Sequence, residues 1–140
     1  MRFWDASALV ALCVTEVTTD VLRQLVPGGI VAWSVSLVEM ESAIQRRGRD
    51  GSLGAAEHAA ARTAMRELAA AWTEISALGP VRDRALRLVA THPLRAADAM
   101  QLGAALIAVA DRPSGHAFVC SDGRLRGAAE REGFLVLPAV

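Results

Sequence analysis

The sequence Phe3-Trp4-Asp5-Ala6-Ser7-Ala8-Leu9-Val10 determines the first unit of the fold. The chain opens with a short apolar run over residues 1–4, which predicts a buried strand. Residues 6–13 continue as an apolar segment that predicts a helix. An aspartate therefore stands directly after the first strand and directly before the helix.

Strands and helices are predicted to alternate along the rest of the chain. Further strands are predicted at residues 30–35, 72–75, 117–120 and 135–137, and further helices at 19–25, 37–47, 53–71, 81–90, 95–110 and 122–132. Glycine and proline mark the breaks, with Gly48–Gly51 between two helices, Gly79-Pro80 between a strand and a helix, and Gly133 as a C-terminal stop. This alternation predicts an α/β fold, in which a parallel sheet is covered by helices on both faces.

The composition suits one domain. We expect a single domain over residues 1–140, because 140 residues are too few for two ordinary domains. Hydrophobic residues make up 53% of the chain, and a small domain has much surface relative to its volume. This excess predicts an apolar surface that binds a partner or a second copy of the chain. The alternative is a core that is merely rich in alanine.

Charge and cysteine content exclude several classes of protein. The 15 basic residues, all arginine, balance 15 acidic residues, so any contact with RNA must use a local patch rather than a basic fold. Cys13 and Cys120 form no metal-binding motif, which favours a reducing cytoplasm. The run Ala6–Val14 is flanked by acidic residues, unlike a signal peptide, and no segment is long enough to span a membrane.

Four acidic residues are predicted to converge at one edge of the sheet. Asp5 and Asp122 each follow a strand, Glu39 lies in the first turn of the helix after the second strand, and Asp98 lies near the start of a buried helix. Ligands of open α/β sheets bind outside the carboxyl ends of the strands. Carboxylates gathered there repel one another, and a divalent cation such as Mg²⁺ or Mn²⁺ relieves that repulsion.

Each of these residues also has a purely structural explanation. Asp5 and Asp122 are suited to cap the helices that follow them, and Asp98 could form a salt bridge with Arg95 or another arginine. Ser7 could orient the Asp5 carboxylate or simply cap its own helix. Glu41 competes with Glu39, but two residues on one helix separated by two positions point in nearly opposite directions, so only one can face the site.

Four segments of the chain resemble the motifs of PIN-domain nucleases. Phe3–Val10 resembles the opening motif of that family, and Glu39–Arg46 the second motif, with Glu39 at the functional position. Leu94–Leu102 and Phe118–Leu125 are similar to the third and fourth motifs, with Asp98 and Asp122 as their acidic residues. The closing strand is similar as well, and the chain length resembles that of VapC toxins. Two details depart from the pattern, since Cys120 stands where a small hydroxyl residue is common and Trp33 stands near a position that often carries Ser or Thr.

The resemblance implies a three-layer sandwich with about five parallel strands. It also implies Mg²⁺- or Mn²⁺-dependent endonucleolytic cleavage of RNA that leaves a 5′-phosphate and a 3′-hydroxyl. Asp5, Asp98 and Asp122 would hold the metal, and Glu39 would complete the site or orient the attacking water. Nearby arginines would guide the RNA phosphates; the candidates are Arg46, Arg47, Arg49, Arg124 and Arg126, with a solvated charged surface as the alternative for each.

The resemblance further implies a VapB-like antitoxin as partner, a homodimer and a growth-inhibiting toxin. The segments Val21–Val26 and Leu53–Ala71 would form the walls of the antitoxin groove. The alternatives within the family are an RNA-processing nuclease that is no toxin and an inactive module that binds RNA or protein. A haloacid-dehalogenase-like phosphotransferase is disfavoured, because Ser7 stands where that chemistry needs a second aspartate and the chain has no lysine.

Overall fold

Five parallel strands form the centre of the computed structural model, which describes residues 1–139. The strands are β1 (Arg2–Trp4), β2 (Val31–Trp33), β3 (Thr73–Ile75), β4 (Ala117–Val119) and β5 (Leu135–Leu137), and their order in the sheet is β3-β2-β1-β4-β5. Each strand is parallel to its neighbours, with Phe3 opposite Val31 on one side and opposite Phe118 on the other.

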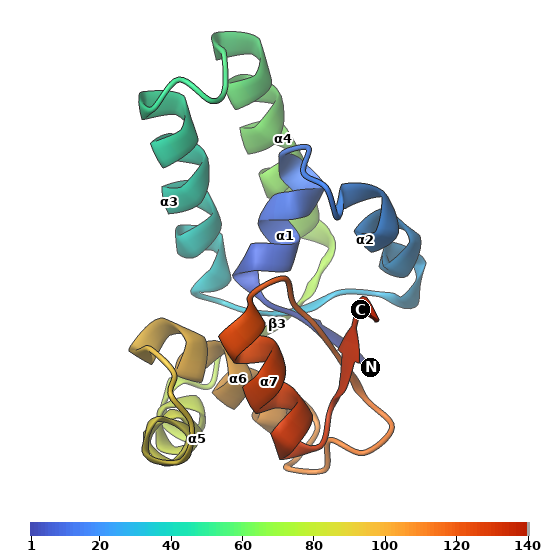
Figure 1. Ribbon diagram of the computed structural model, residues 1–140, viewed down its shortest axis with the longest axis vertical. Coiled ribbons are helices and arrows are strands. Elements are labelled where there is room, and N and C mark those ends of the chain that lie inside the picture. The colour runs from blue at the N-terminus through green and yellow to red at the C-terminus, as the bar shows by residue number, and fades with distance from the viewer. Residues whose placement is uncertain (140) are drawn as a thin grey trace.

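Helices cover both faces of the sheet (Figure 1). They are α1 (Ala6–Cys13), α2 (Thr19–Leu25), the short 3₁₀ helix η1 (Val26–Gly28), α3 (Ser36–Arg49), α4 (Ala55–Ala71), α5 (Leu78–Thr91), α6 (Ala96–Ala108) and α7 (Gly123–Glu132). Side chains alternate across a strand, so Phe3 packs in one core with α5, α6 and α7, whereas Trp4 packs in a second core with α1, α3 and α4. The predicted three-layer α/β sandwich is therefore confirmed.

Two helix boundaries predicted from glycine and proline were wrong. Gly48 was expected to end its helix, yet α3 continues to Arg49, because one glycine costs a helix only about 1 kcal/mol. Gly79-Pro80 was expected to precede a helix, yet α5 begins at Leu78 and contains both residues in its first turn. The first N–H groups of a helix have no partner within the helix, so a proline there loses no hydrogen bond.

The strand order creates a switch point between the two central strands. From β1 the chain crosses to β2 by way of α1 and α2, and from β4 it crosses in the other direction to β5 by way of α7. In such sheets the crevice outside the carboxyl ends of these two strands is the ligand site. Asp5 and Asp122 follow β1 and β4, so both lie at this crevice. No helix within residues 1–139 is long and apolar enough to cross a membrane.

Gly103 allows α6 to pack closely against α5. A Cβ atom at this position would lie 2.8 Å from the backbone carbonyl oxygen of Val81 and 3.3 Å from the backbone nitrogen of Ala85. Backbone atoms in a helix cannot yield as a flexible side chain can, so the two helices would have to separate. Since α6 carries Asp98, this contact also fixes the position of an acidic residue.

We predict that Gly103→Ala destabilises the protein by about 1–3 kcal/mol, the usual cost of overpacking. The matched control is Gly79→Ala in α5, where nothing lies within 4 Å of an added Cβ and alanine is the better helix former. Urea unfolding of both variants measures the difference. A Gly103→Ala protein as stable as wild type would show that the close packing is not required.

Candidate metal and active site

Asp5 is a buried carboxylate with hydrogen bonds to both oxygens. It caps α1, with Oδ1 accepting from the backbone N–H of Ala8 at 3.0 Å. The Ser7 hydroxyl lies 2.8 and 2.9 Å from the two carboxylate oxygens, and the Cys120 thiol donates to Oδ2 at 3.3 Å. Burial raises the pKa of Asp5 to about 6, although the hydrogen bonds from Ala8, Ser7 and Cys120 lower it in part.

Asp122 and Asp5 are both in contact with the sulfur of Cys120. It caps α7, with Oδ1 accepting from the backbone N–H of Leu125 at 2.9 Å, and it is exposed. The backbone N–H of Asp122 lies 3.3 Å from the sulfur of Cys120, which also contacts Asp5. Both aspartates therefore cap helices as the structural explanation predicted, but capping occupies only one oxygen of Asp122 and leaves the other available for a ligand.

Asp98 and Glu39 line one cavity of this crevice. Burial raises the pKa of Asp98, as does the negative charge of Asp122. Burial also raises the pKa of Glu39, and the charges of Asp5 and Asp98 add to this effect. Glu39 thus senses the charges of Asp5 and Asp98, and Asp98 senses that of Asp122, so the four predicted acidic residues lie along one crevice.

None of these four carboxylates forms an ion pair within residues 1–139. Arg95 lowers the pKa of Asp98 only through its charge, so the expected alternative, a salt bridge between the two, is not formed. Glu41 behaves differently, because it pairs with Arg62 at 2.9 Å and its pKa is lowered, first by a hydrogen bond from Gln45. The prediction that Glu39 and Glu41 face opposite ways is confirmed.

Gln101 is a residue of the site that the sequence analysis missed. Its side chain is buried and lies 2.9 Å (Nε2) and 3.2 Å (Oε1) from the hydroxyl of Ser36, which is also buried. A hydrogen bond from Gln101 lowers the pKa of Glu39 and so favours its charged form. A signal was present in the sequence, since Gln101 lies one turn after Asp98 in an otherwise apolar helix and buried amides require partners.

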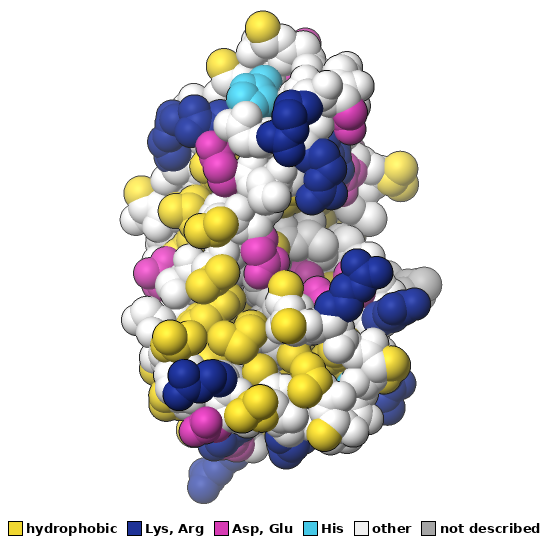
Figure 2. Space-filling view, turned by 90° about the vertical axis from the view of Figure 1, so that its left-hand side faces the viewer, with side chains coloured by type: hydrophobic (Ala, Val, Ile, Leu, Met, Phe, Trp, Pro, Cys, Tyr) yellow, Lys and Arg dark blue, Asp and Glu magenta, His cyan; other side chains and the backbone are white. Residues whose placement is uncertain are grey.

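Two cavities meet at Asp98. The larger, of about 670 Å³, lies between α1, α3 and the start of α6, and its lining includes Ser7, Glu39 and Arg46 as well as apolar side chains such as Val10 and Val38. The smaller, of about 370 Å³, lies between the starts of α6 and α7 and is lined by Arg95, Asp98, Asp122, Gly123 and Arg124. Figure 2 shows acidic side chains in a hollow on this side of the molecule, with basic side chains beside them.

The predicted RNA-binding arginines fall into three groups. Arg46 lines the larger cavity and Arg124 the smaller one, and both are exposed. Arg47 also lines the larger cavity but pairs with Glu16. Arg126 donates to the carbonyl oxygens of Cys120 and Pro138 at 2.7 and 2.6 Å, a structural role, and Arg49 lines grooves between α3 and α4 instead.

The donor set fits a hard divalent cation. The four side chains offer only oxygen atoms, which Mg²⁺ and Mn²⁺ prefer, and a cation would offset the burial and the charge repulsion that raise the pKa values of Glu39 and Asp98. As the side chains stand, no three His, Cys, Asp or Glu residues within 1–139 are grouped closely enough to hold a metal ion. Coordination by three of these side chains would therefore require them to move closer together.

Comparisons with known proteins show which fold the chain has, but they do not show an activity. No protein-family model matches the chain, and no curated protein matches it. The fold is similar to that in the crystal structure of PAE2754 from Pyrobaculum aerophilum, with a TM-score of 0.68 over 97% of this chain and 88% of that chain. The two sequences are 19% identical, and at that level the similarity shows the fold alone. The fold and site together define an α/β three-layer protein with an acidic crevice at its switch point.

We predict that Asp5→Asn stabilises the metal-free protein at high pH but not at low pH. Because the pKa of Asp5 rises from 3.8 to about 6 on folding, the protonated form favours the native state below about pH 4, and this contribution is lost as the pH rises through 6. The amide has no charge to bury, so its advantage should reach about 1–3 kcal/mol at about pH 8. Thermal unfolding in EDTA at both pH values measures it.

Added Mg²⁺ should make the wild-type protein more stable than Asp5→Asn at high pH, which is the reverse of their order without metal. Mg²⁺ that binds the native site raises the Tm of wild type by mass action, and it should raise that of Asp5→Asn less. An equal effect of the substitution at both pH values would contradict the assignment of Asp5 as a carboxylate kept in unfavourable surroundings.

Proposed function

We propose that this chain is a metal-dependent endoribonuclease of the PIN-domain type and the toxin of a VapBC-like toxin–antitoxin pair, acting in the cytoplasm. The observation that carries the proposal is that Asp5, Glu39, Asp98 and Asp122 lie along the crevice at the switch point and that none of them forms an ion pair within residues 1–139. The toxin role and the RNA substrate rest on the resemblance of the four sequence motifs.

In the proposed reaction, each residue of the site has a separate role. Asp5, Asp98 and Asp122 would hold Mg²⁺ or Mn²⁺, an ion that supplies charge neutralisation at the scissile phosphate and lowers the pKa of water. Ser7 and Cys120 keep the Asp5 carboxylate in one orientation by donating hydrogen bonds to it. Glu39 accepts a proton from the attacking water, and Gln101 holds the Glu39 carboxylate in place from its buried position.

Cys120 departs from the family pattern, but its thiol can still orient the Asp5 carboxylate. A thiol there donates to Asp5 at 3.3 Å, as a hydroxyl in the same place would. Trp33, the other departure, is buried in the core formed with α5 and α6. Neither departure removes an acidic group from the site.

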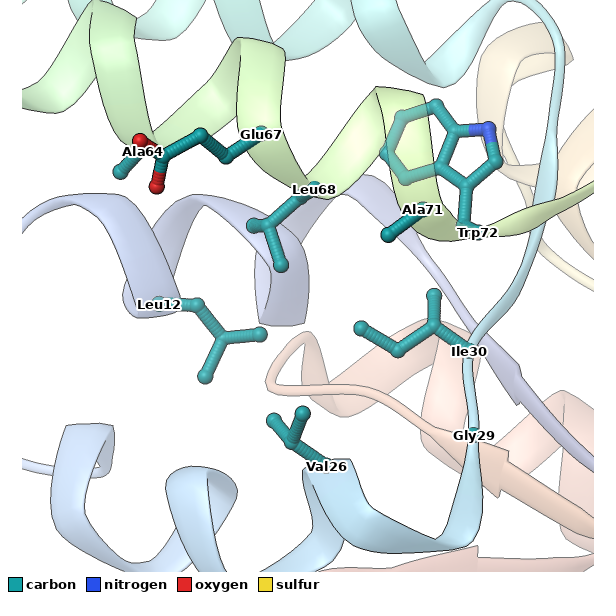
Figure 3. A pocket seen from close by; sticks show the side chains of 9 residues that line it. All are labelled: Leu12, Val26, Gly29, Ile30, Ala64, Glu67, Leu68, Ala71 and Trp72. Carbon is teal, nitrogen blue, oxygen red and sulfur yellow. The ribbon is translucent and has the colours of Figure 1, made fainter.

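An apolar groove away from the site suits the proposed antitoxin. A cavity of about 380 Å³ is lined by Leu12 of α1, Val26 of η1, Ile30 just before β2, and Leu68 of α4. Figure 3 shows these side chains around it. Glu67 is the charged residue of its lining. The segments Val21–Val26 and Leu53–Ala71, expected as groove walls, thus contribute to opposite sides of one cavity. We assign it to an apolar segment of the antitoxin with a basic residue near Glu67.

A second exposed apolar surface supports the proposed homodimer. Leu78, Leu86 and Val89 of α5 are between 44% and 63% exposed, and Val35 and Val38 are exposed at the start of α3. Apolar side chains gather on this side of the molecule in Figure 2. Pairing of two copies through this surface would remove these side chains from water.

We predict that Glu39→Gln lowers the rate of RNA cleavage by 100-fold or more in Mg²⁺, because proton transfer by a positioned group contributes about 10²–10⁴-fold. The matched control is Glu41→Gln, the same substitution two residues further along α3, where the carboxylate pairs with Arg62 outside the acidic site. Gel assays on a labelled single-stranded RNA measure both rates. Equal rates for the two variants would contradict the assignment, and wild-type protein that cuts no RNA in Mg²⁺ or Mn²⁺ would contradict the proposed activity.

A further inference from the structure

We propose that Arg95 and Arg124 form a binding subsite for the RNA phosphate next to the one that is cut. This inference rests on the proposed function, and it assigns the smaller cavity beside Asp98 to one chemical group of the substrate. Arg95 was not among the arginines predicted from the sequence to bind RNA.

The side chains that line the smaller cavity are charged, and its two arginines suit a phosphate group. Its five lining residues are Arg95, Asp98, Asp122, Gly123 and Arg124, so each of its side chains is charged. The larger cavity differs, because apolar side chains such as Val10 and Val38 lie among its polar ones. Asp98 belongs to both cavities, so a strand with its scissile phosphate at Asp98 can place a base on the apolar side and its next phosphate on the arginine side.

Both arginines are available for a ligand. Neither Arg95 nor Arg124 makes an ion pair within residues 1–139, whereas Arg47, Arg62, Arg84 and Arg87 each pair with a carboxylate. Arg95 and Arg124 are also exposed, so a strand can reach them. A guanidinium binds phosphate through two parallel hydrogen bonds.

The backbone adds to the positive potential of this cavity. Arg95 is the N-terminal cap residue of α6, which has no side-chain cap, and Arg124 lies in the first turn of α7, where Asp122 caps only the N–H of Leu125. The positive ends of two helices therefore meet beside two unpaired arginines. Once Asp98 and Asp122 are engaged by a cation, the net charge around the cavity is positive.

Binding of RNA to a cleavage-impaired protein tests the subsite. The probe is a fluorescein-labelled single-stranded RNA of about a dozen nucleotides, the background is Glu39→Gln, and anisotropy in Mg²⁺ gives the Kd at several salt concentrations. The test variant is Arg95→Gln/Arg124→Gln. The control, Arg82→Gln/Arg131→Gln, removes the same charge at exposed arginines that form no ion pair in the described chain. Arg131 lies on α7 two turns beyond Arg124.

We expect the test variant to raise the Kd at least tenfold and the control to leave it within about twofold. The slope of log Kd against log salt should fall by about 0.7 in the test variant, the value for one phosphate of a single strand, and stay unchanged in the control. Equal Kd values for the two variants, whether both weakened or both unaffected, would overturn the subsite. Cleavage by wild-type protein, assayed in parallel, reports separately on the proposed function, because the Kd comparison does not depend on turnover.

Discussion

The gathering of partly or fully buried carboxylates at one edge of the sheet is the constraint on which the site depends. Burial raises the pKa of Asp5, Glu39 and Asp98, and the charges of neighbouring carboxylates raise it further for Glu39 and Asp98. A fold gains nothing from such an arrangement unless a cation or another positive ligand comes to it, because each unpaired carboxylate costs stability. The hydrogen bonds from Ser7, Cys120 and Gln101 offset only part of this cost, which is what we expect of a site that binds a cation.

The rest of the structure serves to bring these groups together. The sheet order places β1 and β4 side by side at its centre, so residues more than a hundred positions apart meet across one crevice. Gly103 lets α6 approach α5 closely and so positions Asp98. The guanidinium of Arg126 ties the carbonyl of Cys120 to that of Pro138 and fixes the end of β4. Rigid strand ends and helix starts thus position the side chains of the site.

Much of this arrangement could be predicted from the sequence, because alternation of apolar strands with helices is a local signal. The positions of Asp5 and Asp122 followed from the strands before them, and the separate roles of Glu39 and Glu41 followed from helix geometry. The start of α5 could not be predicted from glycine and proline alone, since their effect depends on where the first turn falls. The role of Arg126 depends on carbonyl groups that only the folded chain brings near, as does the pairing of Gln101 with Ser36.

The most direct measurement of the central claim is the anomalous scattering of crystals soaked in Mn²⁺. If the acidic crevice is a metal site, an anomalous peak will lie within about 2.2 Å of carboxylate oxygens of at least two of Asp5, Asp98 and Asp122. A soaked crystal with Mn²⁺ bound elsewhere and no peak among these carboxylates would contradict the claim.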